Sequence, residues 1–136
     1  MTRTELIAAL EKAVGASREL DRDIALTLDM YPETIREDLG CYLDDPAMTC
    51  GGGEVWAPPA FTSSIDAALT LVPDGWRVQV LSEWDNPTLR SRGPWQAILC
   101  EAGQGDGMNG KPRCDHAPNP AIALCIAALK ARGETP

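Results

Sequence analysis

Histidine, aromatic residues and the common catalytic motifs are scarce in this sequence. One histidine occurs in 136 residues, and aromatic side chains make up 5% of the composition. The sequence has no GxSxG nucleophile elbow, no HExxH zinc motif and no P-loop. These absences argue against the usual serine hydrolases, zinc proteases and nucleotide hydrolases. With few aromatic residues available, we expect a core built from Leu, Ile, Val and Ala.

Long apolar runs and paired cysteine motifs are missing too. The longest apolar run, residues 121–129, is far shorter than the ~20 residues that a membrane-spanning helix needs. The N-terminus has no basic segment followed by a continuous apolar one, so we expect no export and no membrane contact. The cysteines are an odd set without a CxxC pair, which favours a reducing cytoplasm over a disulfide framework. They are Cys41, Cys50, Cys100, Cys114 and Cys125.

Basic residues are too few to balance the acidic ones. Twelve Lys and Arg residues face twenty Asp and Glu residues, giving a formal net charge of -8. This charge repels phosphate backbones and anionic lipid surfaces, so direct nucleic-acid binding is not expected. It fits a solubilising surface, and it also fits an acidic face that occupies a basic nucleic-acid-binding partner.

The first 31 residues predict a pair of helices. Thr2 and Glu5 have the spacing of a capping box, and apolar residues recur at helical spacing up to Gly15. Ser17 has the properties of a second N-cap. Residues 32–53 lose this periodicity and contain Asp-Pro and Gly-Gly-Gly punctuation, so we predict an irregular insert there.

Two proline-marked helix starts lie in the remaining framework, residues 54–133. The first predicts a helix over residues 63–72 with Ser63 as its N-cap. Its buried stripe is predicted to consist of Ile65, Ala68, Leu69 and Val72. The second predicts a helix over residues 119–132, opened by Asn-Pro and apolar nearly all round. We expect this last helix to be the most buried element.

Segments of alternating polarity predict the sheet. Residues 76–81 and 95–100 predict an antiparallel hairpin, and short strands are predicted near residues 113–116 and 54–57. Trp76, Val78 and Val80 are expected to face the helices. The more polar second face, with Leu81, Ile98 and Cys100, is left for the N-terminal helices, for a partner or for a second copy of the chain. The predicted fold is α+β in one domain, residues 1–136, with a small antiparallel sheet of three or four strands sandwiched between helices.

Three segments together carry a resemblance to a known family. They are residues 58–68 (PPAFTSSIDAA), the pair Gly75-Trp76 and residues 117–131 (APNPAIALCIAALKA). This combination resembles the phage ABA-sandwich domain, a group of small phage and prophage proteins. The resemblance covers roughly residues 56–132, and its motifs concern packing and capping. It implies the cytoplasm of a host cell, and it transfers no catalytic site and no cofactor.

Cys114 and His116 are the residues considered for chemistry. Together with Cys41, Cys50 or Cys100 they would supply the ligand types of a tetrahedral zinc site, and His116 would be the base of a cysteine hydrolase. The spacings typical of zinc sites are absent, and Cys125 belongs to an apolar run. We therefore assign no metal and no catalytic residue, and keep an enzyme or metal-binding protein as an alternative.

Two loops are the candidate binding sites. Trp84, Arg90, Arg92 and Trp95 place two tryptophans and two guanidinium groups around one loop of an acidic protein. Stacking and cationic donors suit an anionic or aromatic ligand such as a nucleotide, or a protein interface. The candidate contacts of the second loop, residues 103–111, are Asp106, Asn109 and Lys111.

The sequence and the resemblance together predict a non-enzymatic, phage-type accessory protein that acts by binding. Counter-defence is the expected role, through a host protein or through a small nucleotide messenger. A small hydrolase or metal-binding protein using Cys114 and His116 remains one alternative. A virion or assembly component is another, and a homo-oligomer formed through the polar face of the sheet stays open.

Overall fold

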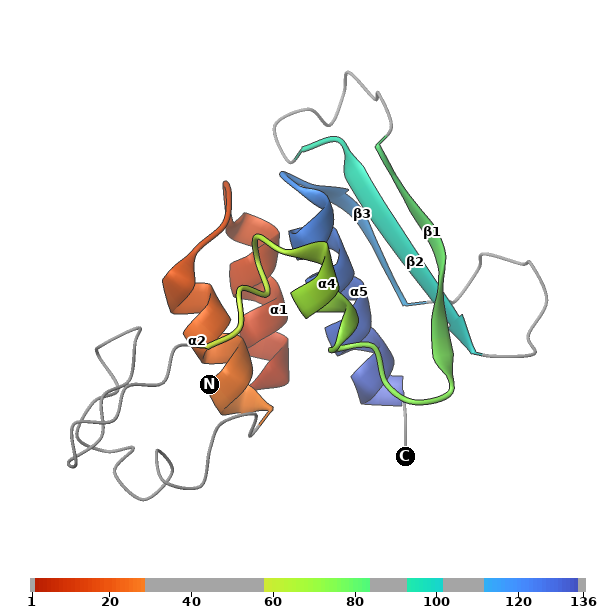
Figure 1. Cartoon of the computed structure of the whole chain (residues 1–136), viewed down its shortest axis with the longest axis horizontal. Helices are drawn as coiled ribbons and strands as arrows, with labels where there is room; N and C mark the ends of the chain where they lie inside the picture. Colours follow the sequence, from red (N-terminus) through yellow and green to blue (C-terminus); the bar gives the residue numbers. More distant parts are fainter. Residues whose placement is uncertain (1, 29–57, 84–92, 102–111, 135–136) are drawn as a thin grey trace.

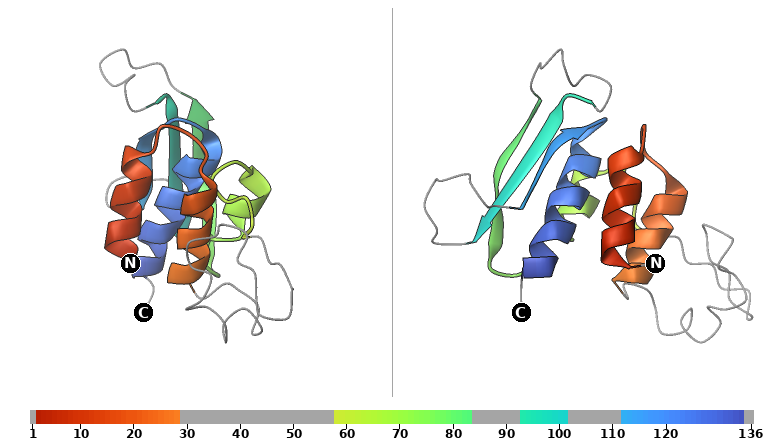
Figure 2. Two further views of the ribbon diagram at one scale, coloured as in Figure 1. Left: turned by 90° about the vertical axis from the view of Figure 1, so that its left-hand side faces the viewer. Right: turned by 180° about the vertical axis from the view of Figure 1, so that it is seen from behind.

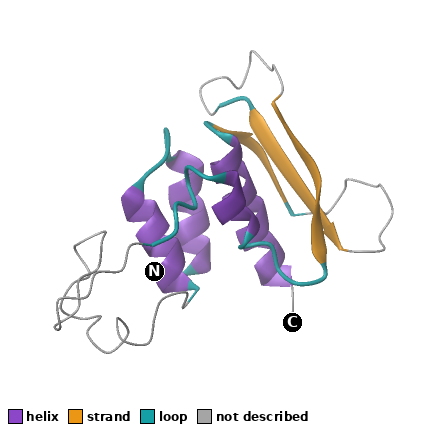
Figure 3. Cartoon of the chain, in the orientation of Figure 1, coloured by secondary structure: helices purple, strands orange, loops and turns teal. Residues whose placement is uncertain are grey.

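A three-stranded antiparallel sheet lies against the C-terminal helix, which packs on its other side against the N-terminal helices (Figure 1). The computed structural model describes residues 2–28, 58–83, 93–101 and 112–134. Within these residues the elements are α1 (Arg3–Lys12), α2 (Arg18–Thr27), α4 (Ile65–Leu69), β1 (Trp76–Glu83), β2 (Trp95–Glu101), β3 (Arg113–Ala117) and α5 (Pro120–Glu134). The predicted α+β class with an antiparallel sheet is confirmed (Figure 3).

The N-terminal helices begin at the predicted caps. The Thr2 hydroxyl oxygen accepts a hydrogen bond from the Glu5 N–H at 3.1 Å, and the Ser17 hydroxyl oxygen accepts one from the Leu20 N–H at 3.3 Å. The position of this pair differs from the expectation. Helix α1 packs against α5, so the described helices lie on one side of the sheet and the pair does not cover its second face or an edge (Figure 2).

Helix α5 occupies the centre of the molecule, and the prediction that it is the most buried element is confirmed. Every residue from Ala121 to Leu129 is at most 2% exposed. Strands β2 and β3 contact one side of α5, while α1 and α4 contact other sides. Because the helix is apolar all round, it needs neighbours all round, and this need explains why α1 packs on α5 rather than on the sheet.

Helix α4 starts one residue later than predicted and is shorter. Its N-cap is Ser64, not Ser63, and the Ser64 hydroxyl oxygen accepts a hydrogen bond from the N–H three residues on at 3.2 Å. The predicted stripe is wrong for Ile65 and Leu69, which are 40% and 41% exposed. Ile65 and Leu69 lie four residues apart and so share one face of the helix, and this face is partly exposed. The buried side chains are Ala68 and Leu71.

A bulge in β1 changes which side chains face the helices. The pairing of β1 with β2 skips one residue, Gln79, between Val78 and Val80. Beyond this extra residue the pleat reverses, so Leu81 packs against the core together with Trp76. The predictions that Val80 faces the helices and that Leu81 lies on the second face are therefore wrong.

Strand β2 is central and pairs antiparallel with both neighbours, and the predicted strand near residues 113–116 is present as β3. The insert at residues 32–53 and the candidate strand at residues 54–57 lie outside the described residues. Within the described ranges, no helix combines the length and apolar character required to cross a membrane.

Candidate functional site

Trp95 is the only predicted binding residue that the structure describes. Trp84, Arg90, Arg92, Asp106, Asn109 and Lys111 lie outside the described residues. Trp95 opens β2, where it pairs with Glu83 of β1 and with Ala117 of β3. Its partly buried side chain packs against the hydrophobic core. The buried part of the Trp95 indole therefore contributes to packing of the sheet against the core.

The chain enters β2 through a backbone position that requires glycine. Gly93 has φ 102°, a conformation that L side chains rarely adopt. A Cβ at this position would overlap the backbone carbonyl of Ala117 and the nitrogen of Pro118. The Gly93 backbone thus packs directly on the end of β3. Since Glu83 pairs with Trp95, both ends of the segment 84–94 meet at one end of the sheet.

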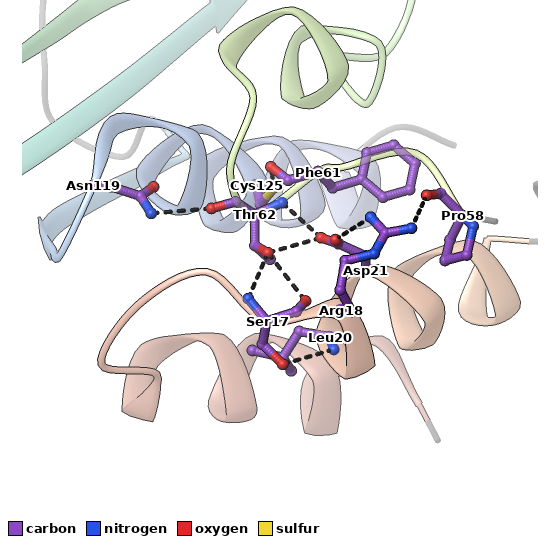
Figure 4. A network of polar contacts seen from close by, with 9 residues as sticks. All are labelled: Ser17, Arg18, Leu20, Asp21, Pro58, Phe61, Thr62, Asn119 and Cys125. Atoms are coloured by element: carbon purple, nitrogen blue, oxygen red, sulfur yellow. Dashed lines mark hydrogen bonds and ion pairs between the residues drawn. The ribbon is translucent and has the colours of Figure 1, made fainter. Parts of the chain in front are cut away.

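A buried polar network joins α2 to the segment that precedes α4 (Figure 4). Asp21 is 1% exposed, and its Oδ1 accepts a hydrogen bond from the Thr62 N–H at 2.7 Å. The Thr62 hydroxyl lies 2.8 Å from Asp21 Oδ1 and 3.1 Å from the Ser17 carbonyl oxygen, and its single hydrogen serves one of them at a time. The same hydroxyl oxygen accepts a hydrogen bond from the Ser17 N–H at 2.9 Å.

Further hydrogen bonds extend this network to α5 and to Pro58. Arg18 donates to Asp21 Oδ2 at 2.7 Å and to the Pro58 carbonyl at 2.7 Å. Asn119 donates to the Thr62 carbonyl at 3.0 Å, just before α5 begins. Thr62 and Asn119 belong to the segments that carry the family resemblance, so in this chain those residues connect helices.

The contact between Cys114 and His116 that the structure shows runs from the Cys114 thiol to the backbone of His116. The Cys114 thiol is 4% exposed and donates to the backbone carbonyl of His116 at 3.5 Å. Burial raises the pKa of Cys114 from the usual 9.0 to about 11, and burial also raises the pKa of Cys125. A thiol with such a pKa is protonated at neutral pH, whereas a cysteine nucleophile needs the thiolate. No group of three or more His, Cys, Asp or Glu side chains suited to a metal ion occurs within the described ranges.

The raised pKa of Cys114 predicts that stability falls in alkaline solution. The folded state keeps the Cys114 proton up to a pH of about 11, whereas the unfolded chain releases it near 9.0. The stability that depends on this proton is therefore fully present below pH 9. As the pH rises from 9 toward 11, the free energy of unfolding falls by up to roughly 1.4 kcal/mol per pH unit. Urea unfolding at several alkaline pH values measures the slope. In Cys114→Ala the slope should be shallower; equal slopes in both proteins would contradict the assignment.

A pocket of about 160 Å³ opens where β3 meets α5 and α1, and we call it the β3 pocket. Its lining residues are Glu11, Arg113, Cys114, Asp115, His116, Ile126 and Lys130. Arg113 and Asp115 form an ion pair at 2.6 Å, and Lys130 donates to the Arg113 carbonyl at 3.0 Å. The β3 pocket therefore combines charges of both signs with the buried side chains of Cys114 and Ile126.

A second hollow, of about 330 Å³, lies where α4 and α5 begin. Its lining residues are Ser63, Ser64, Ile65, Asp66, Asn119, Pro120 and Ala121. The side chains of Ser64 and Asn119 already accept hydrogen bonds from the first turns of the two helices. This hollow consequently offers fewer charged groups to a ligand than the β3 pocket does.

Several basic side chains in the described part of the chain donate hydrogen bonds to backbone carbonyls of the same chain. Arg132 donates to the Leu71 carbonyl at 2.8 Å, just as Lys130 and Arg18 donate to backbone carbonyls. The described acidic side chains are more often exposed. The exposed ones are Glu5, Glu11, Glu19, Asp66, Asp74, Glu83 and Glu101, against Arg3, Lys12, Arg18 and Arg77 among the basic residues.

Comparisons with protein-family models, with curated proteins and with solved structures find no match for this chain. The resemblance to the phage ABA-sandwich domain thus stays a prediction from the sequence.

Proposed function

We propose that this protein is a phage-type accessory protein that acts by binding, and that its target is a basic host protein. The phage setting and a role in counter-defence come from the sequence resemblance. The observation that carries the binding mode is the division of charge: half-buried basic side chains bond internally, while carboxylates dominate the exposed, described surface.

This division has a physical consequence for recognition. A basic group that donates to a backbone carbonyl keeps its charge but has fewer N–H groups left for direct contacts with a partner. Exposed carboxylates act together at long range. Among the described residues, seven exposed acidic side chains stand against four exposed basic ones, so this part of the surface carries an excess of negative charge. A partner with a basic surface, such as a protein that itself binds nucleic acid, would associate faster and in a salt-dependent manner.

Three charge-neutralising double variants test this proposal. They are Glu5→Gln with Glu19→Gln on the N-terminal helices, Asp66→Asn with Asp74→Asn around α4, and Glu83→Gln with Glu101→Gln on the sheet. We expect one of them to weaken capture of the partner from host lysate about tenfold at low salt, chiefly through slower association. Lys12→Gln, which removes an exposed positive charge, is the matched control and should not weaken capture.

The salt dependence separates this proposal from its competitors. Capture by the wild-type chain should decline when ionic strength increases from about 0.05 to about 0.5 M, because the Debye length shortens. A complex that is insensitive both to salt and to all three double variants would rule out recognition through the acidic surface.

A small nucleotide messenger is the second candidate ligand. The observation that favours it is the pairing of Glu83 with Trp95, which fixes both ends of the segment carrying Trp84, Arg90 and Arg92 to the end of the sheet. A thermal-shift titration with cyclic oligonucleotides and ADP-ribose tests this candidate, because a ligand of the folded state raises the midpoint of unfolding. Arg90→Gln with Arg92→Gln should abolish the shift, and a shift that persists in this variant would place the ligand elsewhere.

A further inference from the structure

We propose that the β3 pocket binds a small zwitterion, a molecule of amino-acid size with one carboxylate and one ammonium group. This inference concerns a different surface from the one that carries the proposed function, and either can fail without the other. Its basis is a pair of opposite charges, Lys130 of α5 and Glu11 of α1, that line the same pocket without pairing with each other.

Lys130 supplies the positive end of the pocket. Its ammonium group donates one hydrogen bond, to the Arg113 carbonyl at 3.0 Å, which leaves two of its three N–H groups for other acceptors. Across the described ranges, no carboxylate lies within 4.0 Å of this ammonium group. A ligand carboxylate would complete the hydrogen bonding of Lys130.

Glu11 supplies the negative end. It lies near the C-terminal end of α1, it is exposed, and within the described part of the chain it forms no ion pair. The remaining charges of the pocket compensate each other, because Arg113 and Asp115 are ion-paired at 2.6 Å. The pocket thus presents one available cation and one available anion.

Both charges act on a common point. Lys130 lowers and Glu11 raises the pKa of Cys114, although burial is the larger influence on that thiol. The two opposite charges line one pocket with Cys114 and lie more than 4.0 Å apart, so a ligand seated in the pocket can meet one with each end. Helix α1, helix α5 and strand β3 lie side by side in the views of Figure 2, which is how residues so distant in sequence come to share a pocket.

Size and sign narrow the class of ligand. A cavity of about 150 Å³ holds a benzene-sized molecule, so a pocket of about 160 Å³ suits an amino acid with a small side chain rather than a nucleotide. A simple anion would be attracted by Lys130 but repelled by Glu11. A simple cation would be attracted by Glu11 but repelled by Lys130. A zwitterion satisfies both groups, with Cys114 and Ile126 available to contact its apolar part.

The test compares three probes of similar size by ¹⁵N–¹H NMR titration of the full chain: L-alanine, propionate and propylammonium. We expect L-alanine to shift the amide resonances of β3 and of the residues around Lys130, and to bind at least about tenfold more tightly than either single-charge probe. Equal binding of propionate and L-alanine would replace the proposal by an anion site. An absence of shifts with all three probes would overturn it.

Single-residue variants test whether Lys130 and Glu11 bind the two charged ends of the ligand. Glu11→Gln and Lys130→Met should each weaken L-alanine binding about tenfold, since each removes one charge-assisted hydrogen bond. Glu5→Gln, on the same helix as Glu11 but outside the lining of the pocket, is the control and should bind as the wild-type chain does. Because Glu11 is exposed, Glu11→Gln keeps the test valid even if Lys130→Met fails to fold. Unchanged binding in Glu11→Gln would overturn the proposal.

Discussion

Replacing Gly93 by alanine is expected to lower the free energy of unfolding by about 4 kcal/mol or to prevent folding. The left-handed backbone at φ 102° accounts for part of this loss, about 1–3 kcal/mol. The rest arises because the new Cβ would overlap backbone atoms of Ala117 and Pro118, which cannot rotate away as a side chain can. Relief requires that β2 and β3 separate where Trp95 pairs with Ala117. Urea unfolding followed by circular dichroism measures the loss.

Gly75 provides the matched control for this substitution. It also has a positive φ, 85°, but no heavy atom lies within 4 Å of the position where a Cβ would be. Gly75→Ala should therefore show the conformational cost alone, about 1 kcal/mol. If the two variants lose the same stability, the close approach of Gly93 to β3 plays no part and the argument for that contact fails.

The helices could be predicted from the sequence where local signals determine them. The Thr2 and Ser17 caps, and the helix that follows Asn119, depend on residues only three or four positions apart. Ser63 and Ser64 show the limit of that approach. Both are adjacent serines able to cap α4, and the choice between them depends on how Phe61 and Thr62 pack against other elements.

The sheet was predictable as strands but not in register. Alternation in residues 76–81 indicates a strand, yet the bulge at Gln79 arises from pairing with β2 and leaves no mark in the sequence of β1 alone. The side of the sheet that the N-terminal helices would occupy was equally undetermined. That position depends on α5, whose second side needed cover.

The candidate site residues also differ in how far the sequence alone could predict them. Trp95 was predicted from the sequence as a binding residue, and the structure shows that its side chain packs against the core. The sequence could not predict that Glu11 and Lys130 line one pocket, because they lie on different helices and far apart in sequence. Asp21 did leave a signal: it falls on the stripe that Ile24 and Leu28 define, and a carboxylate on an apolar stripe indicates a buried partner. The partner, Thr62, is 41 residues away and could not be identified.

Asp21→Ala is expected to lower the free energy of unfolding by about 2–4 kcal/mol. The carboxylate is 1% exposed and holds Thr62 through its N–H at 2.7 Å, while its other oxygen accepts from Arg18. Removing it leaves the buried Thr62 N–H without an acceptor, and water cannot easily reach this group. Arg18 loses one acceptor but keeps its hydrogen bond to the Pro58 carbonyl. The same change should accelerate hydrogen exchange at Thr62, because its amide loses its only acceptor within the described residues.

Asp23→Ala is the control for this prediction, since Asp23 lies in the same helix, is 23% exposed against 1% for Asp21, and is 3.6 Å from Arg22. It should cost less than about 1 kcal/mol. Asp21→Asn, which keeps the shape and one acceptor, should fall between the two. A double-mutant cycle of Asp21→Ala with Thr62→Val isolates the pair itself, with an expected coupling of roughly 1–3 kcal/mol. Equal losses in Asp21→Ala and Asp23→Ala would mean that Asp21 does not stabilise the connection between α2 and the segment before α4 that is drawn in Figure 4.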